Sequence, residues 1–287
     1  MKYSTISFPG LGIQWNPGRG IQIGSFTIYY YALIIALGVM LAVMYALKRC
    51  KQFGLKQDDI LDGVLWILPV AVICARAYYC IFSWDSYKND LLSLFNIRKG
   101  GLAIYGGVIG AALCVIVHCR IKKISLLATL DMVALGFLIG QALGRWGNFF
   151  NREAFGAATE SFLRMGLLNT TTGEFEYYHP TFLYESLWNA AGFVLLHLLS
   201  KRRRYDGQIA LGYVAWYGLG RTFIEGLRMD SLYWGAFRVS QLLAAVSCFI
   251  AAVILIVLAF RPHDEKKLFV NKLAIQETEE KEVEDNA

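Results

Sequence analysis

Long apolar runs alternate with shorter polar segments along most of the chain. Each run is roughly 20 residues long, the length that an α-helix needs to cross the hydrocarbon core of a bilayer. Only helices and closed barrels satisfy the backbone in lipid, and barrels show an alternating pattern over about 10 residues instead. The pattern therefore predicts an all-α, polytopic integral membrane protein with about seven transmembrane helices, at residues 26–47, 60–82, 101–119, 125–143, 181–199, 208–226 and 237–260.

Other segments differ from these runs. Residues 1–25 are rich in Gly and Pro, which predicts irregular structure at the membrane surface. Residues 150–180 are polar and too long for a simple connector, so we expect a small external subdomain there. The charged residues 262–287 cannot bury a core. We therefore expect one membrane domain over 1–261 and a disordered tail over 262–287.

Composition and charge agree with a membrane protein. Hydrophobic side chains make up 56% of the residues and charged ones 17%. The net charge of +6 does not indicate nucleic acid, because the basic residues lie in short clusters beside apolar runs. Such clusters follow the first, third, fifth and seventh runs, which predicts an external N-terminus and a cytoplasmic tail. The first 25 residues lack a basic region followed by an apolar core, so no cleavable signal peptide is expected.

The fourth run ends in the polar stretch Gly144–Gly156, GRWGNFFNREAFG. Ionisable groups are expensive at membrane depth, so they need partners or a function. On the preceding helix, Gly136, Gly140 and Gly144 form a small-residue face that permits close packing of another helix.

A different face of the same helix carries Asp131, Gln141, Arg145 and Asn148. Arg145 is a candidate ligand-binding residue at this position. The structural alternatives are a buried pair with Asp131, or an arginine that extends to the lipid headgroups. The sequence leaves these alternatives open.

In the sixth run, Tyr217, Arg221, Glu225 and Arg228 fall on one helical face. Glu225 and Arg228 suit a structural ion pair as well as they suit a site. Arg221 lies one turn deeper and is the better candidate for a ligand. Together with Arg145 it forms a bidentate receptor for phosphate, because each guanidinium presents paired donors.

Further polar groups lie where other apolar runs begin. Tyr105 stands among the glycines of GGLAIYGGVIG (100–110), which suit a close backbone approach, a broken helix or simply a tightly packed helix. His179 opens the fifth run in HPTFLYE (179–185), and a lone histidine there is more often structural than catalytic. Tyr31 with its neighbours is typical of an aromatic belt.

Several chemistries are not indicated. The six cysteines form no C-x-x-C pair, so neither a metal site nor a disulfide framework is predicted. The chain has no Ser–His–Asp pattern, no P-loop and no H-E-x-x-H. It offers fixed positive charge and hydrogen bonds, which suit a phosphate-bearing lipid whose reaction partner supplies the nucleophile. We expect no cofactor.

These motifs together resemble those of the bacterial prolipoprotein diacylglyceryl transferase family. GRWGNFFNREAFG agrees at every fixed position with that family's signature, Gly-Arg-x-Gly/Ala-Asn-Phe-x-Asn-x-Glu-x-x-Gly. HPTFLYE, YGLGRTFIEGLR (217–228) and GGLAIYGGVIG resemble further family motifs. The similarity extends from about the first helix to the seventh, and so long a signature is hard to match by chance.

The resemblance implies a seven-helix enzyme of the bacterial inner or plasma membrane. Such an enzyme transfers the diacylglyceryl group of phosphatidylglycerol to the lipobox cysteine thiol of a prolipoprotein signal peptide. The product is a thioether, and glycerol 1-phosphate leaves.

The resemblance also implies roles for individual residues. It predicts Arg145, Arg221, Tyr105 and Glu153 as catalytic, and Arg145, Asn148, Tyr31, Arg221, Gly156 and His179 as phosphatidylglycerol-binding. Glu225 with Arg228 keeps the structural ion-pair role that their helical spacing suggests. Tyr105 departs from the family, because many members carry histidine there, which has been proposed as a base for the thiol. Tyrosine, with a pKa of about 10, is a poor base near neutrality. We therefore expect Tyr105 to orient the lipid through a hydrogen bond.

A second hypothesis comes from another functional class. A transporter or flippase for an anionic lipid or metabolite can use the same arginines as a binding site. It needs an exit to the other leaflet and makes no covalent product.

Overall fold

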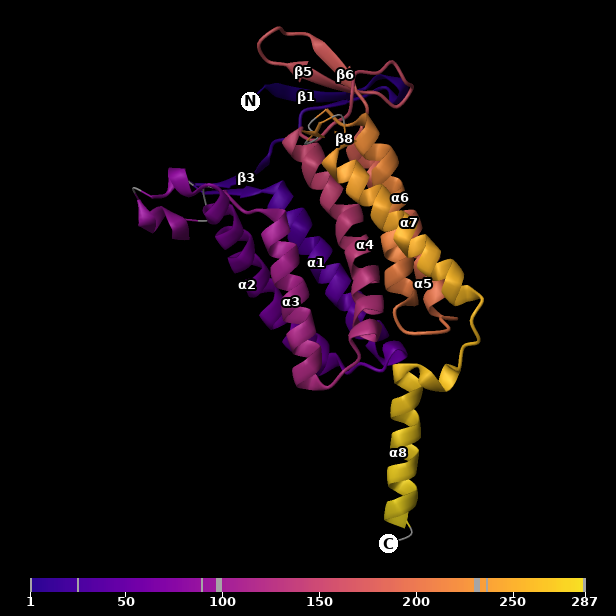
Figure 1. Ribbon diagram of the computed structural model, residues 1–287. Coiled ribbons are helices and arrows are strands. Elements are labelled where there is room, and N and C mark those ends of the chain that lie inside the picture. The colour runs from indigo at the N-terminus through magenta and orange to yellow at the C-terminus, as the bar shows by residue number, and fades with distance from the viewer. Residues whose placement is uncertain are drawn as a thin grey trace. The chain divides into compact units, whose positions relative to one another are not determined.

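The computed structural model of the protein describes residues 2–24, 26–88, 90–96, 100–229, 233–235 and 237–285. This part of the chain is predominantly helical (Figure 1). Its α-helices are α1 (Tyr30–Arg49), α2 (Gln57–Phe82), α3 (Ile104–Lys122), α4 (Leu126–Asn151), α5 (Thr181–Ser200), α6 (Gln208–Leu227), α7 (Val239–Ala259) and α8 (Phe269–Asp285).

Among the described residues, six helices are long and apolar enough to cross a membrane. They are α1 with the turn that extends it to Phe53, followed by α2, α3, α4, α5 and α7. The prediction of a polytopic helical membrane protein is therefore confirmed. α6 forms where the sixth span was predicted but is not among these six helices, and Arg221 and Glu225 lower the hydropathy of its sequence.

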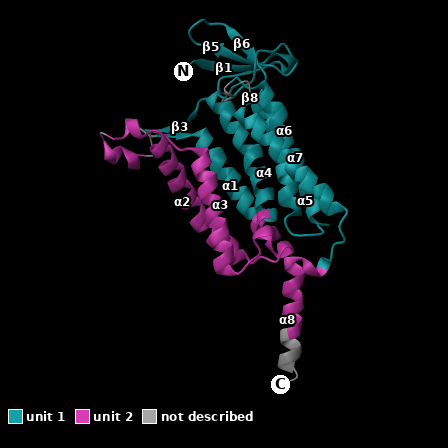
Figure 2. Cartoon of the chain, in the orientation of Figure 1, with its two compact units in different colours: residues 1–45, 131–265 teal, residues 46–130, 266–287 magenta. Residues whose placement is uncertain are grey.

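The chain divides into two compact units, which Figure 2 shows in different colours. Unit 1 comprises residues 1–45 and 131–265, and unit 2 comprises residues 46–130 and 266–287. The boundaries fall inside α1 and α4, so each of these helices contributes to both units.

Unit 1 carries a four-stranded antiparallel sheet in the order β2-β1-β5-β6. Its strands are β1 (Tyr3–Phe8), β2 (Ile13–Trp15), β5 (Met165–Asn169) and β6 (Phe175–Tyr178). In the register of β1 with β5, Ile6 lies opposite Leu167. The expectation of irregular structure over residues 1–25 is wrong, because the first strand pairs with β5, within the segment 150–180. Two short hairpins, β3 (Gly20–Ile23) with β4 (Phe26–Tyr29) and β7 (Tyr233–Trp234) with β8 (Phe237–Arg238), complete the strands that are described.

The sheet packs on the ends of two helices of unit 1 (Figure 1). Ile6 and Leu167 from the sheet form one buried cluster with Phe149 of α4 and Phe182 of α5. Both phenylalanines belong to the polar motifs singled out in the sequence. Burial of their rings therefore fixes these motifs beneath the sheet, since each fully buried aromatic or aliphatic side chain contributes about 1.5–3 kcal/mol.

A hydrogen-bonded carboxylate also ties the first strand to the hairpin. Glu176 accepts hydrogen bonds from the hydroxyls of Tyr3 and Tyr178, each at 2.6 Å, and from Nδ2 of Asn169 at 2.7 Å. The bond from Tyr178, followed by those from Tyr3 and Asn169, lowers the pKa of Glu176 to about 2.

Unit 2 is built on the close packing of α2 against α3. A Cβ at Gly106 would lie 2.4 Å from the carbonyl oxygen of Cys74, and one at Gly110 would lie 2.5 Å from the Cβ of Cys74. These two glycines therefore serve helix packing, as one of the sequence interpretations held. Pro69 lies inside α2, where an unbroken helix is described.

Arg76 of α2 organises the connection that leads to α3. Its guanidinium donates hydrogen bonds to the carbonyl oxygens of Ser93, Leu94, Gly100 and Gly101 at 2.8–2.9 Å. The guanidinium N–H groups of this buried arginine therefore fix the backbone of the segment that precedes α3.

Residues 262–287 were expected to be disordered, but the structure describes the helix α8 within them. Glu, Lys and Gln favour helices, and this propensity accounts for a helix without an apolar core. At its start α8 contacts the turn that follows α1, where a Cβ at Gly54 would lie 2.9 Å from the Cα of Val270. The predicted boundary between a domain over 1–261 and a tail stays a prediction.

Candidate active site

A buried carboxylate joins the two arginines that the sequence singled out. Glu185 lies near the start of α5 and is 3% exposed. Its Oε2 pairs with Nη2 of Arg145 from α4 at 2.5 Å. Its Oε1 accepts a hydrogen bond from Nη1 of Arg221 in α6 at 3.1 Å. Side chains from three helices therefore meet at one carboxylate.

A second carboxylate, Glu225, extends this cluster. It is 2% exposed, and its Oε2 pairs with Nη2 of Arg221 at 2.5 Å. Arg228 lies 3.6 Å from Glu185 and 3.9 Å from Glu225. Glu225 and Arg228 thus lie within ion-pair distance of each other, and both also belong to the cluster of Arg145 and Arg221. Buried charges need such partners, because desolvation costs several kcal/mol per ion.

The cluster carries one net positive formal charge, because three guanidiniums share two carboxylates. Glu185 and Glu225 already pair with the three guanidiniums in this arrangement. An incoming anion must therefore replace a carboxylate or share its arginines. Each guanidinium has five N–H donors, so sharing is chemically possible.

The predicted small-residue face of α4 packs against α1, as expected. A Cβ at Gly38 of α1 would lie 3.5 Å from the Cα of Gly140. About two turns further along α4, the ring of Tyr31 occupies the space that a side chain at Gly147 would need. This contact places Tyr31, which is 40% exposed, against the turn that carries Arg145 and Asn148.

Tryptophans join α4, α5 and α6 around the cluster. Trp188 and Trp216 stack at 4.4 Å between ring centroids, and each Nε1–H donates to the other residue's carbonyl oxygen at 2.9 Å. Trp146 donates to Oγ of Ser186 at 3.1 Å, and this hydroxyl donates to the carbonyl of Ala142 at 2.7 Å. These directional bonds fix the helices that present the arginines.

The polar stretch after Arg145 forms a turn with strained backbone. Arg152 and Ala154 have φ values of 56° and 57°, which non-glycine residues rarely adopt. Glu153 between them is exposed, and its Oε1 accepts hydrogen bonds from Asn148 at 3.2 Å and from Asn151 at 3.0 Å. The turn thus gathers the predicted site residues Asn148 and Glu153 into one hydrogen-bonded group. Strain of about 1–3 kcal/mol per such residue is typical of functional segments.

Arg152 has a structural position although it lies in the same stretch. It is buried, and it donates to the carbonyls of Ser4 at 2.6 Å, Phe150 at 3.1 Å and Pro17 at 2.5 Å. These bonds attach the N-terminal strands to the turn.

Gly156 and His179 lie against each other. The N–H of Gly156 donates to the carbonyl of His179 at 2.9 Å, and a Cβ at Gly156 would lie 2.7 Å from the Cβ of His179. The next amide, that of Ala157, donates to the carbonyl of Leu227 at the end of α6. Gly156 therefore places the turn against α5 and α6. The side chain of His179 has a contact of its own, because its Nδ1 lies 3.4 Å from the hydroxyl of Tyr184.

The suggested pair of Arg145 with Asp131 is wrong. Asp131 is fully buried and accepts hydrogen bonds from the backbone N–H groups of Gly207, Ile209 and Ala210 at 2.8–2.9 Å. N–H groups at the start of a helix have no acceptor within the helix itself, and the helix dipole favours a carboxylate at this end. Asp131 thus fixes the start of the helix that carries Arg221.

Tyr105 belongs to unit 2 and the arginine cluster to unit 1. Within its unit, Tyr105 lies in the first turn of α3 and is 53% exposed. Among the residues described, no group of three or more His, Cys, Asp or Glu side chains could hold a metal ion.

The sequence analysis missed Glu185 as a site residue. It is the one acidic residue within the fifth apolar run, and an intramembrane carboxylate is by itself a functional candidate. The sequence therefore marked Glu185 as a candidate. Its pairing with Arg145 and Arg221 could not be predicted without knowing which helices pack together.

Fold and site together define a polytopic membrane protein in which three arginines surround two buried carboxylates. Comparison with known proteins identifies the family. Residues 20–258 match the model of the family described as prolipoprotein diacylglyceryl transferase. The chain belongs to this family, so the predicted membrane transferase is confirmed, and the transporter hypothesis gains no support.

Several relatives are named phosphatidylglycerol–prolipoprotein diacylglyceryl transferase. One from Listeria monocytogenes serotype 4a is 46% identical over 241 residues, covering 82% of this chain and 87% of its own. One from Enterococcus faecalis is 44% identical over 243 residues, with the same coverage of each chain. One from Bacillus cytotoxicus is 40% identical over 259 residues, covering 88% of this chain and 95% of its own.

Proposed function

We propose that the chain transfers the diacylglyceryl group of phosphatidylglycerol to the lipobox cysteine of a prolipoprotein signal peptide in a bacterial inner or plasma membrane. The observation that carries this proposal is the placement of Arg145 and Arg221, from separate helices, on the shared carboxylate of Glu185. Planar guanidiniums held in this way present paired donors to a phosphate.

The reaction is a displacement at carbon. The thiolate sulfur attacks the glyceryl carbon that carries the phosphate ester, and a C–S bond forms. The C–O bond to the phosphate breaks, its electron pair stays on the phosphate oxygen, and glycerol 1-phosphate leaves. The thiol proton passes to a base. The products are a thioether and a phosphomonoester, and no redox partner is required.

Charge accumulates on the phosphate as this bond breaks, from one negative charge in the lipid toward about two in the leaving group. The arginine cluster has one net positive charge while both carboxylates are ionised. We propose that the lipid phosphate displaces Glu185 from part of its pairing with Arg145. Arg221 then stabilises the developing charge electrostatically.

The remaining predicted residues have supporting roles in this proposal. Asn148 and Glu153 hydrogen-bond to each other beside Arg145, where they suit contacts with the glycerol hydroxyls of the headgroup. Tyr31 packs on the same turn and offers its hydroxyl to the lipid. Gly156 and His179 hold the turn against α5, and Tyr105 orients the lipid.

The orientation proposed from the basic clusters has its own test. Reporter fusions at Lys51, Lys122, Arg203 and the tail are expected to give cytoplasmic signals, and a fusion within 150–180 an external one. An external signal at Arg203 would contradict this orientation.

Activity is tested with purified protein, phosphatidylglycerol and a lipobox peptide, analysed by mass spectrometry. The expected product is the peptide with one diacylglyceryl group on its cysteine, together with free glycerol 1-phosphate. A peptide with serine in place of cysteine is the matched control and should stay unmodified. Transfer of lipid between leaflets without a covalent product would favour a transporter instead.

A further inference from the structure

A pocket with polar and apolar lining residues lies in unit 1, at the opposite end of α5 from Glu185. It has a volume of about 340 Å³ and is lined by Arg204, Tyr205, Gln208, Leu255, Ile256, Ala259 and His263. The length of α5 between Glu185 and this end corresponds to roughly 20 Å at 1.5 Å per residue. The pocket is therefore separate from the arginine cluster.

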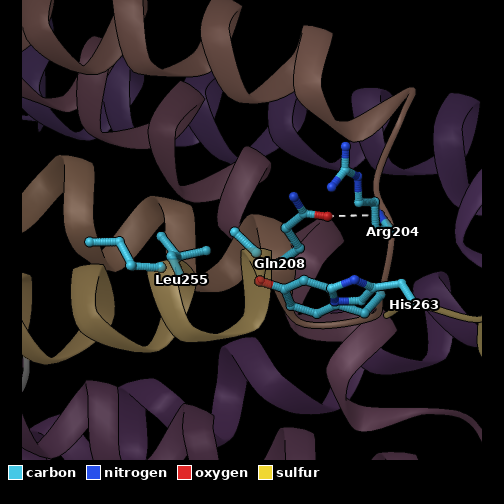
Figure 3. A pocket seen from close by; sticks show the side chains of 7 residues that line it. Arg204, Gln208, Leu255 and His263 are labelled. Atoms are coloured by element: carbon cyan, nitrogen blue, oxygen red, sulfur yellow. Dashed lines mark hydrogen bonds between the residues drawn. The ribbon is translucent and has the colours of Figure 1, made fainter. Parts of the chain in front are cut away.

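The pocket is polar at one end and apolar at the other (Figure 3). Gln208 is fixed because its Oε1 accepts a hydrogen bond of 2.7 Å from the backbone N–H of Arg204, which leaves its amide nitrogen to donate elsewhere. In Figure 3 the Arg204 guanidinium lies on the same side as this amide, and Leu255 lies at the far end. His263 stacks on Tyr205 at 4.8 Å between ring centroids and closes one wall.

Charges of both signs adjoin the pocket, and Arg204 is the one arginine or lysine among the residues that line it. Arg204 ends the basic run Lys201–Arg204 and is exposed. Within this run, Arg203 is buried and lies 3.6 Å from Asp206. Asp264 and Glu265 follow His263, and both have interactions of their own. The Arg204 guanidinium is therefore the cation that the pocket presents.

We propose that this pocket binds the headgroup of an intact anionic phospholipid. The phosphate accepts hydrogen bonds from Arg204 and the Gln208 amide, and the acyl chains run over Leu255 and Ile256 of α7. The apolar end favours a lipid over a soluble phosphate ester, because Ile256 is 58% exposed in a helix apolar enough to span the membrane. A volume near 300 Å³ is sufficient for a headgroup.

Binding of short-chain phosphatidylglycerol to the purified full-length protein in detergent tests this proposal. Every sample also carries Arg145→Gln, which weakens the proposed active site, so that the bound lipid reports this pocket. Salt at about 0.5 M screens diffuse attraction, because the Debye length then falls to about 4 Å. Arg204→Gln removes the phosphate partner, whereas Ala259→Trp fills the pocket without changing any charge.

Arg204→Gln should weaken binding roughly tenfold, the effect of losing one charge-assisted contact. Ala259→Trp should weaken it by at least as much, because the indole occupies the space of the headgroup. Arg202→Gln removes a neighbouring exposed charge that does not line the pocket, and Val257→Trp places a tryptophan on the same helix outside the pocket. Both controls should stay within about twofold of the parent. Equal weakening by Arg202→Gln, or equal binding of phosphatidylcholine, would overturn the proposal. Equal binding of glycerol 3-phosphate alone would reassign the pocket to a soluble phosphate ester.

Discussion

Arg76 in unit 2 and Arg145 in unit 1 are both arginines within helices apolar enough to span a membrane, but their charged groups are held differently. Arg76 donates to the backbone carbonyls of Ser93, Leu94, Gly100 and Gly101. Arg145 pairs with the side chain of Glu185, which Arg221 shares. Arg152, only seven residues after Arg145, resembles Arg76 because backbone carbonyls accept its hydrogen bonds.

The difference separates structural arginines from exchangeable ones. A backbone carbonyl is part of the fold, so replacing it by a ligand requires the chain to move. A carboxylate is an anion of similar geometry to a phosphate, and a guanidinium binds either in a bidentate manner. The kind of acceptor therefore indicates function better than membrane depth does.

The largest effect is expected from Glu185→Gln, which keeps the shape of the side chain and removes its charge. Arg145 and Arg221 then lack a shared counterion, and breaking a buried ion pair costs about 3–5 kcal/mol. Thermal unfolding in detergent without lipid should show this loss, and added phosphatidylglycerol should restore part of it by supplying the missing anion. Glu160→Gln, at an exposed position, is the matched control. Wild-type stability of the lipid-free Glu185→Gln protein would contradict the view that this carboxylate holds the arginines.

Much of the helical fold was predictable, because a membrane requires long apolar runs and each run appears directly in the sequence. The sheet was not predictable in the same way. β1 pairs with β5, so Ile6 finds its partner in Leu167, and such distant pairing leaves no local pattern. Gly- and Pro-rich composition near the N-terminus further obscured the strands.

Lysine substitutions at Arg145 and Arg221, the two arginines of the proposed active site, are expected to have the next largest effect. Lysine keeps the charge but loses the bidentate fork, and a lost charge-assisted hydrogen bond costs roughly 1.5–3 kcal/mol, or about one to two decades in rate. Arg145→Lys should chiefly raise the Michaelis constant for phosphatidylglycerol, and Arg221→Lys should chiefly lower turnover. Initial rates over a series of phosphatidylglycerol concentrations give both constants, and the folding of each variant is checked separately.

Arg76→Lys is the comparison variant for these kinetics. It should reduce thermal stability, because several backbone carbonyls lose their donor, while the Michaelis constant for phosphatidylglycerol stays near the wild-type value. If Arg145→Lys has wild-type kinetics, or if Arg76→Lys alone raises the Michaelis constant, the distinction between exchangeable and structural arginines fails.

The individual residues of the candidate site were predictable from the sequence, but the pairing of their side chains was not. Arg145, Arg221, Asn148 and Glu153 are recognisable from residue type and motif. Their pairing depends on which helices adjoin, and that is why Glu185 was overlooked. Asp131 illustrates the same limit, since an acid on the polar face of α4 proved to hold the first amides of α6.

A smaller effect is expected from Tyr105→Phe. The change removes one hydroxyl and its hydrogen bond, which is worth about 0.5–1.5 kcal/mol, so activity should fall roughly two- to tenfold. The acid limb of the pH–rate profile should stay in place, because a hydroxyl that orients lipid does not exchange a proton. An inactive Tyr105→Phe protein together with a fully active Tyr105→His protein would instead show that this position acts as an acid or base.

The smallest effect concerns Glu176, a carboxylate held by hydroxyls and an amide rather than by arginines. Its pKa is lowered to about 2, chiefly by the hydrogen bond from Tyr178 and then by that from Tyr3. The folded state thus binds this proton less readily than the unfolded chain, in which a carboxyl of this type titrates near 4.5. The resulting stabilisation is complete above about pH 4.5 and is lost as the pH falls toward about 2. Because Glu176 is partly exposed, solvent screens the interaction and the effect stays small.

Thermal unfolding should show Glu176→Gln as less stable than wild type at pH 7, with the two proteins converging toward pH 3. A stability difference that is unchanged between these pH values would mean that the ionised carboxylate is not what joins β1 to β6.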